Sequence, residues 1–458
     1  MEKRSRLREN RILLRVPASL LLLALAAAPS MAGQGTAFNS ALPLIHVDNG
    51  PNSANAQNSH YVVLVSLDGF RWDYARRDNA THLLALGRQG VWAPEGMLPS
   101  YPSLTFPNLF TIVTGLYPGH HGLVADSFFD PARHARFSST DPQSVSDGSW
   151  YSGTPLWSLA ESQGMRTACL GWPGSEAKIA GFQPSWYAQS IQSEAAPVVL
   201  QAPIDEALAL LRLPSADRPH FIAIDDPEPD RSGRQFGPNA QQTRAAALRM
   251  DAVIGKLKAA LDATGLPIDL VVVSGQGMAQ LQKDQAQGCW IDLDQFADLT
   301  GFDTVGSLLY GKSEADRERV YNQLKKASSQ FVVYRLKNVP ANLDYNRNPR
   351  EGDPVVIATG PYAIRAHATP ARNSQPPTRG VDGYDSRSIP EMKAIFFAAG
   401  PDIVAGKTLA QFENVNLYPW IAHILGLTPP PNDGSLNILA GTLRDNGVEP
   451  ADTPPAQQ

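Results

Sequence analysis

The stretch YVVLVSLDGF, residues 61–70, decides the fold of this chain. Its first seven residues are mostly aliphatic, aromatic or β-branched, which is typical of a buried strand, and Asp68-Gly69 then ends the strand in a turn. Strands that are apolar on both faces occur in parallel sheets covered by helices. Asp68 is therefore predicted at the carboxyl end of a strand, where open α/β sheets bind their ligands.

Similar apolar runs recur along the chain, and helical patterns lie between them. The clearest helical pattern places apolar residues on one face from Met250 to Leu261, and another helix is predicted from Asn416 to before Gly426. This alternation predicts an α/β fold with a mostly parallel central sheet and helices on both faces. The further predicted strands are Arg166–Gly171, Phe221–Ile224, Leu270–Val273 and Ala394–Ala399.

The order of elements changes between about residues 300 and 370. There, short strands at Phe331–Leu336 and Val355–Thr359 accompany a single helix at Ser313–Ala327. We expect a small inserted α+β subdomain within a main α/β domain of residues 59–444.

The two ends of the chain have the composition of processing and linker segments. Residues 1–32 contain six basic side chains, an apolar run at Val16–Ala28 and a small-residue cleavage signal, and so predict a signal peptide. An uncleaved anchor is the alternative, although the apolar run is short for a membrane span. Residues 33–58 are predicted to be a linker and residues 445–458 a flexible tail. The protein is therefore expected to be exported, to a periplasm or out of the cell.

Charge and cysteine content exclude several classes of protein. The net charge is −5, and removal of residues 1–32, with six basic and two acidic side chains, leaves −5 − 4 = −9. An acidic body of this kind disfavours nucleic-acid binding. No apolar run after the leader is long enough for a stable membrane span. Cys169 and Cys289 either form a disulfide or are two buried thiols, and the sequence leaves both alternatives open.

Thr105 lies at the start of a predicted helix that ends at Gly115. Pro107 in the first turn places the Thr105 hydroxyl at or next to the N-cap, beside the partial positive charge of the helix terminus. Helix capping alone would explain a threonine at this position, so a role in catalysis needs further evidence.

Five motifs follow one another along the chain: SLDGF, SLTFPNLFTIVTGLYPGHHG, EPDRSGRQFGP, RGVDGYD and MKAIFFAAGPDI. In this order and spacing they resemble the nucleotide pyrophosphatase/phosphodiesterase family of the alkaline phosphatase superfamily, over about Tyr61 to Leu439. The resemblance implies an alkaline-phosphatase-like fold and a hydrolase in which two zinc ions, held by three Asp and three His, activate a threonine nucleophile. It assigns the nucleophile to Thr105 and two retained metal ligands to Asp68 and Asp230.

The other four ligand positions of the family motifs are substituted. Arg234 replaces the histidine of EPDxxGH, Gly275 and Gln276 replace the Asp-His pair of SDHGM, and Asp382 replaces the histidine before Gly-Tyr-Asp. A fifth change concerns the substrate, because Asp126 replaces an asparagine that contacts phosphate in the family.

These substitutions predict a catalytically impaired pseudoenzyme that binds an unidentified ligand or partner, with no cofactor expected. Arginine cannot bind a metal, because its guanidinium stays protonated and has no lone pair. Without metal, four aspartates and one arginine give the pocket a formal charge of −4 + 1 = −3, which repels phosphodiesters. We expect Arg234 to bridge Asp230 and Asp382 and so replace one zinc ion.

Two alternatives keep catalysis. In the first, the carboxylates bind one Ca²⁺ or Mg²⁺ and the protein is a phosphate-ester hydrolase with a retuned metal site and Thr105 as nucleophile. In the second, the motif frame is slipped by one or two residues, and His367 or Asp385 supplies a missing zinc ligand.

Overall fold

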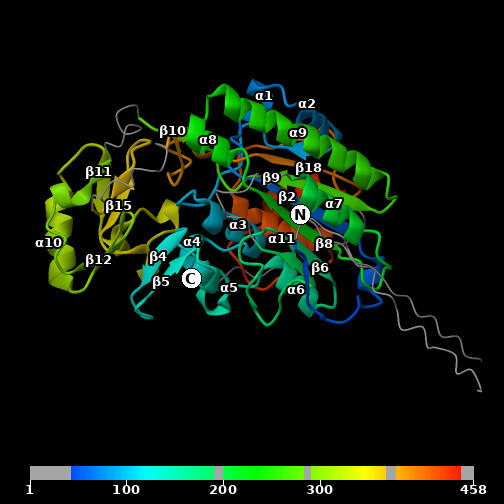
Figure 1. Cartoon of the computed structure of the whole chain (residues 1–458), viewed down its shortest axis with the longest axis horizontal. Coiled ribbons are helices and arrows are strands. Elements are labelled where there is room, and N and C mark those ends of the chain that lie inside the picture. Colours follow the sequence, from blue (N-terminus) through cyan, green and yellow to red (C-terminus); the bar gives the residue numbers. More distant parts are fainter. Residues whose placement is uncertain (1–42, 190–199, 283–289, 368–377, 445–458) are drawn as a thin grey trace, which may run out of the picture. The chain divides into compact units, whose positions relative to one another are not determined.

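The computed structural model describes residues 43–189, 200–282, 290–367 and 378–444, all within one unit of the chain that spans residues 40–458 (Figure 1). The predicted signal peptide, the first part of the linker, the tail and Cys289 lie outside the described residues. The predictions made for those segments, and the pairing of Cys169 with Cys289, therefore stay predictions. No helix in the described part of the chain is long and apolar enough to cross a membrane.

The described residues form a nine-stranded sheet in which β2, the strand predicted from the opening motif, is central. The strand order is β1-β7-β6-β8-β2-β9-β18-β3-β19. In that order the strands are Ile45–His46, Trp186–Ala188, Thr167–Leu170, Phe221–Asp226, Tyr61–Leu67, Ile268–Val273, Phe396–Ala399, Val91–Trp92 and Lys407–Thr408.

The five strands β7, β6, β8, β2 and β9 are parallel, whereas β18 is antiparallel to both of its neighbours. In the centre of the sheet, Val63 of β2 lies opposite Ile222 on one side and Leu270 on the other. The predicted α/β fold with a mostly parallel central sheet is therefore confirmed.

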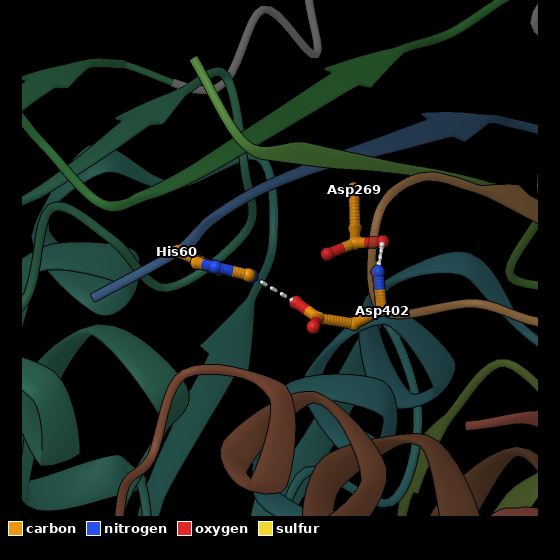
Figure 2. Close-up of side chains that lie close together, drawn as sticks. All are labelled: His60, Asp269 and Asp402. Carbon is orange, nitrogen blue, oxygen red and sulfur yellow. Dashed lines mark hydrogen bonds and ion pairs between the residues drawn. The ribbon is translucent and has the colours of Figure 1, made fainter. Parts of the chain in front are cut away.

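The parallel strands end at one edge of the sheet and begin at the opposite edge, and the two edges carry different polar residues. Asp68 follows the end of β2 at one edge, and Ser274 follows the end of β9 there. At the opposite edge β2 and β9 begin, and the antiparallel β18 ends beside them because Ala399 pairs with Leu270. His60, Asp269 and Asp402 lie close together at that second edge (Figure 2).

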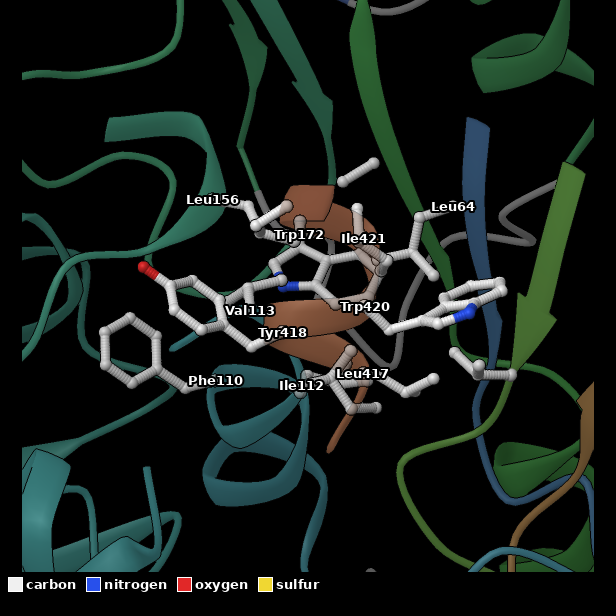
Figure 3. Packing of buried hydrophobic residues seen from close by; sticks show 14 of the residues in the cluster. Leu64, Phe110, Ile112, Val113, Leu156, Trp172, Leu417, Tyr418, Trp420 and Ile421 are labelled. Carbon is white, nitrogen blue, oxygen red and sulfur yellow. The ribbon is translucent and has the colours of Figure 1, made fainter. Parts of the chain in front are cut away.

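Two hydrophobic clusters cover the two faces of the sheet, because side chains alternate along each strand. Val62 and Leu64 join the cluster that includes α3, α6 and α11, whereas Val63 and Val65 join the one that includes α2, α7 and α9. Figure 3 shows side chains of α3 and α11 packed beside Leu64. Each fully buried aliphatic or aromatic side chain contributes about 1.5–3 kcal/mol, so these layers hold the strand ends of the sheet in place.

The helices that cover the sheet have the following bounds. On the first face lie α3 (Thr105–Thr114), α6 (Leu156–Ser162) and α11 (Leu417–Ile424), and on the second lie α2 (Thr81–Gln89), α7 (Gln201–Leu210) and α9 (Gln241–Asp262). The predicted helices near Met250 and Asn416 correspond to α9 and α11. Shorter helices are α1 (Tyr74–Arg77), α4 (Pro118–His121), α5 (Pro142–Ser146), α8 (Asp230–Phe236) and α12 (Leu436–Leu439).

The segment predicted to be an insert contains helix α10 (Glu314–Leu324) and two two-stranded sheets, and its strand β16 forms a third pair with β11, which lies before residue 300. Its residues form a small hydrophobic cluster of their own around Leu309, Val320 and Phe331. The pairs are β11 (Ile291–Asp292) with β16 (Ile364–Arg365), β12 (Phe302–Val305) with β13 (Leu308–Gly311), and β14 (Phe331–Tyr334) with β15 (Val355–Ala358). Outside it, β4 (Ser127–Asp130) pairs with β5 (Ala135–Ser138), and β10 (Ala279–Gln280) with β17 (Gly380–Val381).

Candidate functional site

Thr105 and Asp68 form the centre of the site. Thr105 is the first residue of α3, and its buried hydroxyl donates to the Asp68 carboxylate, with Oγ1 3.0 Å from Oδ2. The hydroxyl caps no backbone amide of the helix, so the capping explanation of Thr105 does not apply. Helix α3 ends at Gly115, whose φ of 65° gives the left-handed C-cap that glycine favours. The helix therefore presents the Thr105 hydroxyl to the carboxyl end of β2.

A tight turn at Gly69 brings Asp68 and Asp230 together. Gly69 has a φ of 67°, and a Cβ there would lie 2.7 Å from the Asp230 Cα, so only glycine allows the two chain segments to approach this closely. The Asp230 backbone amide donates to the Asp68 carbonyl over 2.8 Å. Two motifs that are far apart in the sequence are thus held in backbone contact.

Arg234 bridges two carboxylates, as predicted from the sequence. Asp230 and Arg234 are four residues apart on α8, a spacing that puts them on the same helix face. Arg234 donates Nε to Asp230 Oδ2 over 2.6 Å and Nη2 to Asp382 Oδ2 over 2.5 Å. The Arg234 side chain is 37% exposed, whereas those of Asp230 and Asp382 are 10% and 5% exposed. The bridge therefore covers two buried carboxylates at the solvent side of the site.

Gln276 closes the other side of the site. It is fully buried after β9, and its Nε2 donates to Asp68 Oδ1 over 2.8 Å and to Thr105 Oγ1 over 2.9 Å. Rotating the amide by half a turn would place Oε1 against the carboxylate oxygen, so the neighbouring acceptor fixes the direction of this amide. Gln276 thus turns an amide nitrogen, which has no lone pair for a metal, toward Asp68 and Thr105.

Gly275 contributes no side chain, but a Cβ atom fits at this position. A Cβ at this position would lie 3.4 Å from Leu109 Cδ2 and 3.7 Å from the Thr105 carbonyl oxygen, which are ordinary van der Waals distances. A side chain at position 275 would therefore point to the first turn of α3, beside the threonine.

Asp126 also faces the first turn of α3. Its Oδ1 accepts a hydrogen bond from the Phe106 backbone amide over 3.1 Å, at a helix terminus where negative charge is favoured. Burial and the neighbouring Asp382 nevertheless raise the pKa of Asp126 to about 6. The amide that Asp126 occupies is one that an anionic ligand at the helix N-terminus would otherwise contact.

Asp68, Asp126 and Asp230 hold protons more tightly than isolated aspartates do. Burial raises the pKa of Asp68 well above its ordinary value, and the charges of Asp230 and Asp225 raise it further, whereas Arg234 opposes them. Burial also raises the pKa of Asp230 to about 6 despite the guanidinium beside it. Several carboxylates here share one fixed cation, so the cluster is short of positive charge.

The donor set does not fit two zinc ions. Zinc sites need three or four nitrogen, sulfur or oxygen ligands around each ion, and here Arg234 lies between two of the carboxylates while Gln276 presents its nitrogen. Among the described residues, the one group of three or more His, Cys, Asp or Glu with ligand atoms within 4.8 Å of one another is His60, Asp269 and Asp402, at the other edge of the sheet.

The two residues considered as replacement ligands are engaged elsewhere. His367 has a half-exposed side chain that contacts Asp294, with Nδ1 3.1 Å from Oδ2. Asp385 accepts hydrogen bonds from the Arg387 amide and the Ser388 hydroxyl in its own turn. Neither residue has a hydrogen bond or ion pair with the residues around Thr105, so a slipped motif frame receives no support.

The group at the second edge was not predicted from the sequence. His60 immediately precedes β2, Asp269 is the second residue of β9, and Asp402 follows β18. The sequence does contain one signal, because a polar residue lies at the start of each of two buried strands. Open α/β sheets bind their ligands after the strands, so these positions do not stand out in the sequence. Nothing in the local sequence of Asp402 indicates that it would lie beside the other two.

Comparisons with known proteins agree with this architecture. The family model described as type I phosphodiesterase / nucleotide pyrophosphatase matches residues 62–385, which is more than half of the chain. A pyrophosphatase/phosphodiesterase of Schizosaccharomyces pombe is 33% identical over 390 residues, 82% of this chain and 78% of that protein. Ectonucleotide pyrophosphatase/phosphodiesterase family member 7 of Homo sapiens is 28% identical over 418 residues, 88% of this chain and 87% of that protein.

A venom phosphodiesterase of Macrovipera lebetinus is 30% identical over 416 residues, 85% of this chain but 46% of the venom protein, so the chain spans about half of that relative. Among solved structures, murine ectonucleotide pyrophosphatase / phosphodiesterase 5 has a TM-score of 0.76 and 26% identity, over 84% of this chain and 100% of that chain. The murine protein is a threonine-to-alanine variant described as inactive and in complex with AMP.

Proposed function

Because the chain belongs to the type I phosphodiesterase / nucleotide pyrophosphatase family, we propose that it keeps the family fold and threonine but has lost two-zinc hydrolysis, and that it acts by binding a ligand or partner. The observation that carries this proposal is the position of Arg234. Its guanidinium contacts Asp230 and Asp382 together, the two residues at family ligand positions on that side of the site. A fixed organic cation there supplies positive charge but offers no coordination position to a substrate oxygen.

The environment of Thr105 supports the loss of catalysis. A nucleophilic hydroxyl needs a base or a metal to take its proton. Here the hydroxyl donates to Asp68 and accepts from Gln276, and burial raises the pKa of Asp68. A carboxylate can accept a proton, but the charge that develops on a phosphoryl oxygen needs donors or cations aimed at it, and the guanidinium of Arg234 is already bonded to Asp230 and Asp382.

The charge of the site also indicates what it binds. Asp126 takes up an amide at the N-terminus of α3, where a phosphate oxygen would otherwise bind. Asp230 and Asp382 already bond to Arg234, and the charge of Asp68 adds to theirs. A phosphodiester carries a negative charge and would be repelled. We therefore propose a ligand that presents a neutral or positively charged group to the carboxylates.

Export of the protein is part of the proposal. It rests on the basic, apolar and small-residue segments of residues 1–32. Relatives include ectonucleotide and venom enzymes, whose names place them outside the cytoplasm. The experiment that tests export is N-terminal sequencing of protein recovered from the exported fraction, with cleavage expected after about residue 32.

Hydrolysis is tested on purified protein with a chromogenic phosphodiester, with and without added Zn²⁺, Ca²⁺ or Mg²⁺. We expect the protein to show no hydrolysis above the rate in buffer that is lost when Thr105 is replaced. Turnover that needs one of these ions and is abolished by Thr105→Ala would overturn the proposal in favour of a hydrolase with a retuned metal site.

Restoring the family ligands is the complementary experiment. The variant combines Arg234→His, Gly275→Asp, Gln276→His, Asp382→His and Asp126→Asn, and a Cβ atom fits at position 275. We expect zinc binding at this edge of the sheet to appear with these changes. The matched control adds Thr105→Ala, which should keep the new zinc and remove any new turnover. If unmodified protein already binds zinc at this edge, the substitutions do not have the effect proposed here.

A further inference from the structure

A group of side chains of the types that ligate metals lies at the edge of the sheet opposite Thr105. His60, Asp269 and Asp402 come from three separate segments of the chain and converge in Figure 2. One ligand atom from each lies within 4.8 Å of the others, and His60 Nδ1 is 2.5 Å from Asp402 Oδ2. None of these residues takes part in the site around Thr105.

One carboxylate oxygen of this group is buried without a donor. Asp269 is 0% exposed, and its Oδ1 accepts the Asp402 backbone amide over 3.2 Å. Its Oδ2 is also buried and receives no hydrogen bond from an N–H or hydroxyl group of the described residues, and burial together with the adjacent Asp402 carboxyl raises the pKa of Asp269 to about 8. Buried carboxylate oxygens are costly unless a proton, a donor or a cation satisfies them. In Figure 2 this carboxylate faces the space beside the His60 ring and the Asp402 carboxylate.

At Gly400 the backbone passes very close to Asp269. A Cβ at Gly400 would lie 2.2 Å from Asp269 Oδ1 and 2.5 Å from its Cα, so the chain can pass here only with glycine. This close approach of the two chain segments brings Asp402 beside Asp269, and the Asp402 backbone amide holds Asp269 Oδ1 in place. Asp269 Oδ2 then faces the other two side chains. An anchored ligand of this kind is typical of metal sites, where neighbouring groups orient the ligands.

Other charged and titratable groups border the site, and the charge of Arg444 opposes the rise in the pKa of Asp269. Arg444 donates Nε to the Ile403 carbonyl over 2.9 Å, and the His220 ring stacks on Tyr61 and contacts the His60 carbonyl through Nδ1. The His60 side chain is 38% exposed, which gives an ion a path from solvent and leaves room for a water ligand.

We propose that His60, Asp269 and Asp402 bind one divalent metal ion, with Zn²⁺ as the matching ion. One imidazole nitrogen and two carboxylate oxygens are a typical zinc donor set, and a solvent-facing position completes four-fold coordination. The His60–Asp402 contact would open by several tenths of an ångström to admit the ion. The site is distinct from the Thr105 site and goes beyond the proposed function.

The test is isothermal titration of chelator-treated full-length protein with ZnCl₂ alone. We expect one ion per chain, a rise in the melting temperature with zinc, and a loss of affinity of at least about 10–100-fold in His60→Gln and in Asp269→Asn. Asp269 is buried, so a failure of its variant to fold is uninformative, whereas the partly exposed His60 and the melting shift of the wild type keep the test decisive.

Two control variants separate this site from others. His120→Gln breaks a similar histidine–aspartate contact, in which Nδ1 is 2.7 Å from Asp433 Oδ2 and the described part of the chain supplies no third ligand, and should leave zinc affinity unchanged. Asp382→Asn should also leave it unchanged. Absence of zinc binding, or binding that survives His60→Gln and Asp269→Asn, overturns the inference. Binding lost in Asp382→Asn would instead place zinc at the Thr105 edge, which overturns both this inference and the proposed function.

Discussion

Both edges of the central sheet bring carboxylates together, and the two edges differ in how that negative charge is balanced. At the edge after the parallel strands, Arg234 is close enough to two buried carboxylates to bond both of them. At the edge before those strands, Asp269 and Asp402 lie beside a single histidine, and one oxygen of Asp269 has no donor among the described residues. Asp230 also has a buried carboxylate oxygen without a donor among the described residues, so unsatisfied oxygens occur at both edges. The comparison teaches that the first edge differs in carrying a guanidinium of the chain itself, which bonds two of its carboxylates.

The largest expected effect concerns Arg234. Arg234→Ala leaves Asp230 and Asp382 facing each other without a counter-charge, which costs several kcal/mol for a fully buried group. Because the Arg234 side chain is 37% exposed, water offsets part of this loss, and we expect a decrease of about 1–3 kcal/mol in the free energy of unfolding. Urea denaturation at pH 7 measures it.

The matched control for Arg234 is Lys258→Ala. Lys258 pairs with Asp262 at the same i,i+4 spacing on α9, but the Asp262 side chain is 63% exposed. We expect a change of no more than about 0.5 kcal/mol there. Equal losses in the two variants would show that the bridge at the site is an ordinary surface pair and that the contrast between the edges is unfounded.

The next effect is the pH dependence that Asp126 confers. Its pKa is about 6 in the folded protein and ordinarily about 3.9 when unfolded. The folded state therefore binds this proton more tightly, so the contribution to stability is complete below about pH 4 and is lost as pH rises through about 6. Asp126→Asn should raise the free energy of unfolding by about 1–2 kcal/mol at pH 7.5 relative to wild type, with the gain vanishing near pH 4.

Asp141 provides a control of opposite sign. Its carboxylate accepts the Gln143 and Ser144 amides at the start of α5, and hydrogen bonds, first that of the Ser144 hydroxyl, lower its pKa. Its contribution is therefore present at neutral pH and lost as pH falls, and Asp141→Asn should destabilise rather than stabilise the protein at pH 7.5. Thermal melts across pH 4–8 distinguish the two directions.

A smaller effect is expected at Thr105. Thr105→Val removes the hydroxyl that donates to Asp68 and accepts from Gln276, which leaves part of a buried network unsatisfied and costs about 1 kcal/mol. Thr105→Ser keeps the hydroxyl and should lose less stability than Thr105→Val. If valine proved as stable as serine at this position, the hydroxyl would not be part of the buried network described here.

The smallest effect concerns the partly exposed pair of His120 and Asp433. The hydrogen bond to Asp433 raises the pKa of His120 above its ordinary value of about 6.5. The pair therefore stabilises the protein below that pH, and its contribution disappears as pH rises through the folded pKa. His120→Gln should cost less than about 1 kcal/mol at pH 5.5 and nothing at pH 9, as thermal melts at the two pH values will show.

Much of the fold and of the Thr105 site could be predicted from the sequence. The predicted strand at Tyr61–Leu67 has the bounds of β2, because an apolar run closed by Asp-Gly is a local signal. The bridge by Arg234 was predicted because Arg234 stands at a family zinc-ligand position and because acidic residues outnumber basic ones in the motifs. The catalytic and metal roles attached to these positions remain proposals.

Other features required contacts that no local pattern encodes. The direction of the Gln276 amide depends on which acceptors surround it. Asp269 and Asp402 are neighbours only because β18 pairs antiparallel with β9, which brings the end of β18 to the start of β9. In the sequence, these two aspartates are ordinary residues near strand ends.

By itself, the sequence determined the family, the alternating α/β architecture and the identity of the charged groups, because hydrophobic periodicity and residue type are local properties. Only the tertiary structure decided which charges meet, how deeply each is buried and where a carboxylate oxygen is left without a donor. Electrostatic energies depend on separation and on exclusion of water, and both are fixed by strands and helices that approach one another across the sheet.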